Sequence, residues 1–195
     1  MRATLNQNSK MKAIKIVLVA VTILVSLGVV IAYLPTAPRQ QGFMDGRFEQ
    51  VEANIENKNV IVEEVSSASV GWHLHHILQV SNAFSNGLKS SEPSEYEGFS
   101  PSFSRSVIFL YGDFPRGTAQ APESVQPPSI FSAQDLRDLV KEARLLLDEV
   151  YQLPESAYMD HPVFGQLNKN QTLRFLEIHT DHHFLIIDDI LKASN

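Results

Sequence analysis

The sequence predicts an all-α protein: a four-helix bundle with a long connection between its second and third helices, preceded by one transmembrane helix. Four stretches carry apolar residues at the three- and four-residue spacing of an amphipathic helix. An uncharged apolar run over residues 16–33 precedes them. The chain has 195 residues, so about 155 residues remain for a single domain once this N-terminal segment is set aside.

The amino-acid composition excludes several kinds of site. The chain contains no cysteine, which rules out disulfide bonds, thiolate zinc sites and a cysteine nucleophile. A protein-bound metal would therefore need His, Asp or Glu ligands. The formal net charge is −6, and the residues beyond position 15 form no basic patch, so a nucleic-acid partner is not expected.

The N-terminal segment predicts a signal anchor. Residues 1–15 are basic, and the run that follows reaches the lower limit for crossing a hydrocarbon core of about 30 Å. It is longer than the apolar region of a usual signal peptide, and no small-x-small cleavage site follows it. We therefore expect residues 1–15 in the cytoplasm, 16–34 in the cell membrane and the rest outside the cytoplasm. The alternative is a cleaved signal peptide, which would give a secreted or periplasmic protein.

The first half of the bundle domain is expected after a short linker. The linker, rich in proline and glutamine, covers residues 35–43, and the domain covers residues 44–195. Its first helix is predicted over residues 44–56. Its second helix is predicted from about residue 69 to residue 90.

Three histidines lie near the start of this second helix. At about 100° per residue, His73 and His76 can face the core, whereas His75 falls on the polar side and is expected to meet solvent. Such a triplet is by itself typical of a solvated surface. A second group of histidines on another helix would make it a candidate source of metal ligands.

The second half of the domain contains two more helices. Ser132, with Asp135 three residues later, resembles a helix start, and apolar residues at helical spacing continue to about residue 152. Residues 158–165 link this third helix to the fourth. The fourth helix is expected over residues 171–192.

The fourth helix places two histidines on its apolar side. His179 and His183 project together, opposite the polar residues Glu177 and Asp181. An unpaired buried polar group costs about 1–3 kcal/mol, and a metal ion removes that cost by taking a lone pair from each ring. We therefore predict a metal site, with hydrogen-bonded core histidines as the alternative. His182 falls at the flank of the helix and is expected to be an outer partner or a surface group.

The connection over residues 91–130 is rich in Ser, Pro and Gly. Connections this long within a compact domain are usually functional or partly structured. The turn-rich loop 113–117 is expected to cover the metal site and to limit its access to water. Arg116 is then available to pair with an anionic group of a small-molecule ligand. The alternative is that Arg116 only holds the loop in place through a carboxylate such as Glu123.

Short motifs spread over the domain carry a family resemblance. They are Trp72 with residues 75–77, the segments 114–117 and 121–123, the segment 161–165, and His179-x-x-His182-His183. Together they resemble the DinB-like metal-binding four-helix bundles, and most closely a subfamily without an assigned function. The resemblance implies one divalent ion held by His76, His179 and His183. Trp72 stands closer to His76 than in many DinB-like sequences, which leaves His73 as a competing ligand, and a membrane anchor is not usual in this family.

Three neutral imidazoles would leave one coordination position open, as in catalytic sites. Zinc is favoured by such a nitrogen set, and nickel and iron also suit imidazole. Some DinB-like proteins are thiol-dependent transferases or isomerases, so the resemblance implies thiol activation, and here the low-molecular-weight thiol would have to be a cofactor. The rival chemistry is hydrolysis with Asp181, Glu177 or Asp160 as base, although the first two fall on the polar face.

A non-catalytic function also fits the sequence. The chain would then be a metal- or partner-binding module tethered to the membrane, with no turnover. A homodimer is compatible with either function, and the sequence identifies no substrate.

Overall fold

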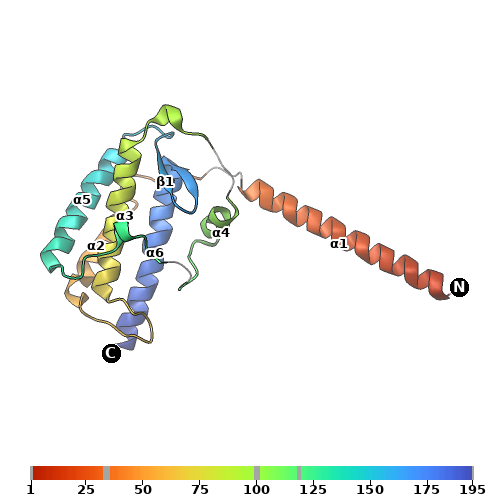
Figure 1. Cartoon of the computed structure of the whole chain (residues 1–195), viewed down its shortest axis with the longest axis horizontal. Helices are drawn as coiled ribbons and strands as arrows, with labels where there is room; N and C mark the ends of the chain where they lie inside the picture. The colour runs from red at the N-terminus through yellow and green to blue at the C-terminus, as the bar shows by residue number, and fades with distance from the viewer. Residues whose placement is uncertain (1, 33–35, 99–101, 118–119, 195) are drawn as a thin grey trace.

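The structure is a computed structural model that describes residues 2–32, 36–98, 102–117 and 120–194 (Figure 1). Within these ranges the chain forms six α-helices and one two-stranded sheet. The prediction of a mostly helical protein is therefore confirmed. The small sheet was not predicted.

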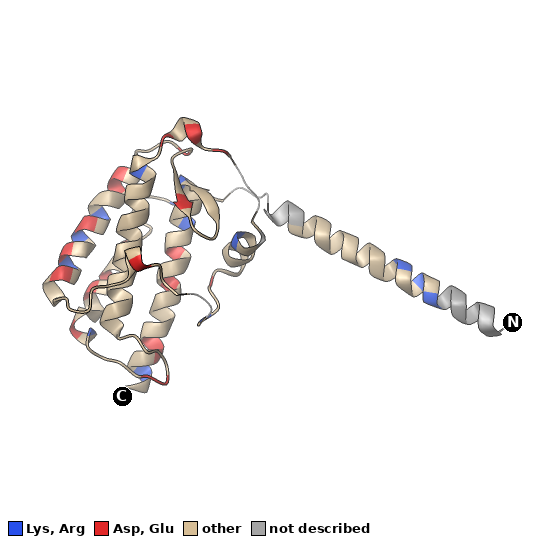
Figure 2. Cartoon of the chain, viewed as in Figure 1, with Lys and Arg blue, Asp and Glu red and all other residues tan. Residues whose placement is uncertain are grey.

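Helix α1, Arg2–Ala32, extends away from the rest of the protein (Figure 1). Its stretch Lys10–Gly28 is long and apolar enough to cross a membrane, and none of that stretch is buried; an N-terminal signal sequence meets the same criterion. Lys10, Lys12 and Lys15 of the N-terminal segment belong to the same helix (Figure 2). Positions 33–35, where the predicted span ends and the predicted linker begins, lie outside the described residues.

Four helices pack side by side and enclose one hydrophobic core (Figure 1). Helix α3 lies in contact with α2, α5 and α6. The fully buried core side chains come from all four helices and include Phe48, Val51, Leu74, Ile77, Leu136, Val140, Leu176 and Ile187. The four helices are α2 (Asp45–Asn54), α3 (Val70–Ser90), α5 (Ala133–Tyr151) and α6 (Lys169–Ala193).

Side-chain caps fix where three of these helices begin. Ser69 accepts a hydrogen bond from the backbone N–H of Trp72 at the start of α3. Ser132 and Asp135 form the predicted capping box of α5. Asn168 and Gln171 form a second capping box, so α6 begins at Lys169, slightly before the predicted start. Such caps satisfy backbone N–H groups that have no partner within the helix.

The connection between α3 and α5 contains a short helix, α4 (Phe103–Tyr111), which ends at Gly112 with φ of 80°. The predicted link before α6 is an antiparallel hairpin of β1 (Tyr158–His161) and β2 (Gly165–Asn168). Single 3₁₀ turns occur at η1 (Ile55–Asn57), η2 (Pro93–Glu95) and η3 (Glu123–Val125). Both α4 and the hairpin lie on the side of the bundle that faces α1 (Figure 1).

The polar side of α6 is covered by arginines. Arg47 of α2 forms two hydrogen bonds of 2.7 Å with the carboxylate of Asp181, and this contact raises the pKa of Arg47. Glu177 lies 2.8 Å from Arg39 and 2.7 Å from Arg174. These ion pairs hold residue 39 and α2 against α6, the helix that carries His179 and His183.

Candidate metal centre

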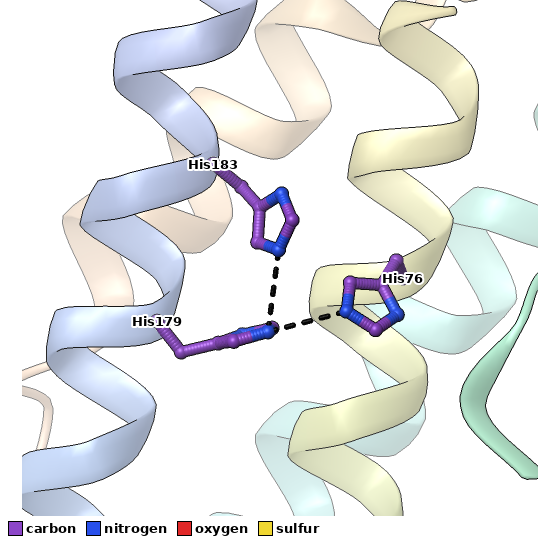
Figure 3. Close-up of side chains that lie close together, drawn as sticks. All are labelled: His76, His179 and His183. Atoms are coloured by element: carbon purple, nitrogen blue, oxygen red, sulfur yellow. Dashed lines mark hydrogen bonds between the residues drawn. The ribbon is translucent and has the colours of Figure 1, made fainter. Parts of the chain in front are cut away.

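Three histidine side chains converge in the core, one from α3 and two from α6 (Figure 3). The Nε2 atom of His179 lies 3.2 Å from the Nε2 atom of His76 and 3.2 Å from that of His183. All three side chains are buried, with exposed fractions of 4% for His76, 9% for His179 and 8% for His183. This three-histidine cluster can hold a metal ion.

Local structure explains the convergence. His179 and His183 are one helical turn apart on α6, and α3 packs directly against α6. Trp72, one turn before His76 on α3, stacks on the His76 ring with centroids 4.9 Å apart. On the other side, Phe175 stacks on His179 at 5.5 Å. The histidines are therefore held between aromatic rings.

Hydrogen bonds to the far ring nitrogens direct two of the three Nε2 lone pairs into the cluster. The Nδ1 atom of His76 donates to the carbonyl oxygen of Val125 at 2.8 Å, which leaves Nε2 without a proton. The Nδ1 atom of His183 lies 2.9 Å from Nδ1 of His73, whose Nε2 lies 3.1 Å from the hydroxyl of Ser66. If His183 donates to His73 and His73 donates to Ser66, the Nε2 of His183 is also free to bind a metal. Outer partners of this kind orient histidine ligands in metal sites.

Burial keeps these rings neutral. Loss of hydration places the pKa values of His179 and His183 well below the ordinary value of 6.5, and it also lowers the pKa of His76. Burial, and next the nearby His76, lower the pKa of His73 to about 4. Neutral imidazole is the form that binds a metal ion.

The three Nε2 atoms of the cluster are poorly satisfied without an ion, whereas an ion would take a lone pair from each; Nδ1 of His179 is buried without a hydrogen-bond partner among the described residues in either case. Because Nε2 of His76 can only accept, and Nε2 of His179 can carry one proton, the two 3.2 Å contacts cannot both be full hydrogen bonds. Zinc–nitrogen bonds of about 2.0–2.1 Å in a tetrahedron place neighbouring nitrogens about 3.3 Å apart. Two of the three nitrogen separations are close to that value, and all three lie within 4.8 Å. The donor set therefore fits a tetrahedral metal ion.

The structure contradicts the predicted environment of His75 and shows the position of His73 relative to the cluster. His75 is buried, with 5% exposed, because Phe131 packs over its ring at 4.8 Å and α5 lies against this side of α3. The prediction that it meets solvent is wrong. His73 contacts His183 from outside the cluster, so the described geometry makes it an outer partner of a ligand.

The loop after α4 lies against the centre, as predicted for a cover. The carboxylate of Asp113 lies 2.7 Å from Nδ1 of His182, which places His182 as an outer group at the flank of α6. Phe114 contacts the rings of His182 and His179 edge-on at 5.6 and 6.3 Å. Phe114 therefore lies directly over part of the centre. A pocket of about 300 Å³ lies elsewhere, between the start of α2 and the end of α5, and none of the three histidines lines it.

Arg116, the predicted ligand contact in this loop, forms a 2.8 Å ion pair with Asp189 of α6 rather than with Glu123. Both side chains are nearly half exposed, at 45% and 44%. Because exposed ion pairs contribute about 0–1 kcal/mol, we expect Arg116→Ala to leave metal content unchanged and to lower the melting temperature by only about 2–4 °C or less. Metal analysis and thermal unfolding of the two proteins measure this. A larger loss of stability would make Arg116 a structural residue and remove it from the ligand site.

The fold and the site together define a mostly helical protein with a buried three-histidine cluster and one apolar N-terminal helix. In comparisons with known proteins, no family model, no curated protein and no solved structure matches this chain. The resemblance of the sequence motifs to DinB-like proteins therefore stays a prediction.

Proposed function

We propose that this chain is a membrane-anchored, DinB-like protein that binds one divalent metal ion through His76, His179 and His183, with its bundle outside the cytoplasm. The convergence of three neutral, buried Nε2 atoms carries the proposal. Zinc is the expected ion because an all-nitrogen tetrahedral set suits it. The ion would join α3 to α6 and remove the conflict among the three nitrogens.

Catalysis at that ion is the second candidate. Three protein ligands leave one position for a water molecule or a substrate, and a divalent ion can lower the pKa of a bound water toward 7 or bind a thiolate. The chain contains no cysteine, so a thiol-dependent transfer would use a small-molecule thiol as co-substrate. The loop with Asp113 and Phe114 supports this candidate, since it lies against His182 and His179, where a cover would limit access of water to the centre.

The positions of the three candidate bases, Glu177, Asp181 and Asp160, do not support direct hydrolysis. Glu177 and Asp181 are paired with arginines on the opposite side of α6. Asp160 is exposed on β1. Thiol-dependent transfer therefore remains the better supported of the two enzyme chemistries.

Metal analysis of the purified full-length protein tests the first proposal. We expect one zinc equivalent per chain in the wild type, and less than about a tenth of that in His179→Gln, since loss of a ligand costs more than the 10–100-fold loss expected for an outer partner. Trp72 is the only tryptophan and stacks on His76, so its fluorescence should respond when Co²⁺ is added to the metal-free protein.

The matched control is His75→Gln, which changes a buried histidine of the same helix outside the cluster. It should keep one zinc equivalent. Equal metal content in His179→Gln and in the wild type would refute the three-histidine site. A zinc-loaded protein that turns over no thiol-dependent substrate would favour the non-catalytic binding module.

A further inference from the structure

Helix α4 carries apolar residues on both of its sides. Its inner side packs on the bundle: Ile108 and Phe109 contact the core, and the guanidinium of Arg105 donates to the carbonyl oxygens of Phe164 and Gln166. A helix that is apolar on every side is normally covered on every side.

The outer side of α4 is exposed and lacks charge. Leu110 and Tyr111 lie three and four residues after Val107, so the three side chains share a face, and they are 44% (Val107), 69% (Leu110) and 79% (Tyr111) exposed. Helix α4 contains no acidic residue, and its single charged residue, Arg105, is only 2% exposed. We call Val107, Leu110 and Tyr111 the outer face of α4.

The position of this face indicates what covers it. Helix α4 is in contact with α1, and it lies on the side of the bundle from which α1 departs (Figure 1). If α1 crosses a bilayer, the end of α1 lies at the membrane surface, and α4 lies at the same level. Apolar residues with a tyrosine at the end of the helix are typical of segments at the lipid–water boundary.

We propose that the outer face of α4 docks on the surface of the lipid bilayer that α1 crosses, an inference that rests on the proposed membrane anchor. The bundle thereby contacts the membrane at two points, the span itself and α4. The left-handed residue Gly112 ends α4 and turns the chain toward the centre, where Asp113 and Phe114 contact His182 and His179. The cover of the metal centre is then continuous with a segment seated at the lipid surface.

Single introduced cysteines test the proposal, because the chain has none of its own. The full-length protein is reconstituted in phosphatidylcholine vesicles that contain a lipid with a shallow nitroxide, and each cysteine carries an environment-sensitive fluorophore. Leu110→Cys reports on the outer face of α4. Leu145→Cys is the matched control, because Leu145 is similarly exposed at 65% but lies on α5, on the far side from α1 (Figure 1). Val21→Cys reports on α1 itself.

The expected result is that nitroxide lipid quenches the Leu110 and Val21 labels several-fold more than the Leu145 label. Equal, weak quenching at Leu110 and Leu145 with strong quenching at Val21 would refute the docking of α4 and keep the anchor. A Leu110 label that is shielded from water but not quenched would also refute it, because a second copy or another protein would then cover this face. Weak quenching at Val21 would refute the anchor and, with it, the docking.

Discussion

Removal of the proposed metal ion is expected to lower the melting temperature of the bundle by about 8–16 °C. An ion present at about 1,000 times its dissociation constant stabilises the folded state by about 4 kcal/mol, and each kcal/mol corresponds to about 2–4 °C in a domain of this size. The effect should be large because the proposed ion would join His76 on α3 to His179 and His183 on α6, at the contact between two core helices.

Thermal unfolding of the full-length protein in detergent measures this effect. The near-ultraviolet circular dichroism of Trp72 is a suitable signal, because Trp72 stacks on His76 and packs edge-on against His73. The comparison is between protein at a buffered free zinc concentration and protein treated with a chelator. His179→Gln is the control, and its melting temperature should be the same in both conditions. A wild-type melting temperature that does not respond to zinc would contradict the proposed site.

The burial of His179 and His183 on one side of α6 could be predicted because helical phase is a local property. At about 100° per residue, positions 172, 176, 179, 183, 186 and 190 share one side of the last helix, and all six are buried. The cap at Ser132 was predicted for the same reason, since it depends on residues within one turn. Periodicity over a few turns is enough for such features.

The environment of His75 could not be predicted in this way. Periodicity separates a polar side from an apolar side, but it does not say which neighbouring element covers each side. Helix α5 packs against the polar side of α3, where Asn82 donates a 2.9 Å hydrogen bond to Glu142, and Phe131 covers His75. A buried polar side is stable when such partners are found, and those partners are distant in the sequence.

The outer groups of the centre were missed or only partly foreseen for the same reason. His73 and His183 are 110 positions apart, and Asp113 and His182 are 69 positions apart. Residues 158–165 were expected to form a link, and they instead belong to a hairpin with a hydrogen-bonded turn. The two histidine contacts are tertiary, and no local pattern encodes them.

That turn is built around the neutral ring of His161. Its Nδ1 atom accepts hydrogen bonds of 3.1 Å from the backbone N–H groups of Val163 and Phe164, and the Phe164 ring stacks on it at 4.5 Å. Burial lowers the pKa of His161 from 6.5 to about 4. Protonation of Nδ1 would remove the acceptor of both hydrogen bonds.

His161 should make the stability of the bundle depend on pH. Between pH 6.5 and about 4 the unfolded chain binds a proton on His161 and the folded chain does not, so the contribution is complete above pH 6.5 and is lost as the pH falls toward 4. This pKa shift corresponds to a stability loss of at most about 3 kcal/mol. The expected loss is smaller, because water screens the partly exposed ring.

We therefore expect the stability difference between the wild type and His161→Phe to shrink by about 2 kcal/mol between pH 7.5 and pH 4.5. At pH 7.5 the phenylalanine should keep the stacking but lose the acceptor, at a cost of about 1–3 kcal/mol. At pH 4.5 the wild type is itself less stable, because its unfolded chain is protonated at His161 and its folded chain is not. Urea unfolding followed by Trp72 fluorescence, with chelator present throughout so that protons do not compete with metal, measures both proteins.

His161→Asn, which supplies an acceptor that does not titrate, should stay more stable than His161→Phe at both pH values. Parallel stability curves for the wild type and His161→Phe would show that this ring does not control the acid sensitivity of the bundle.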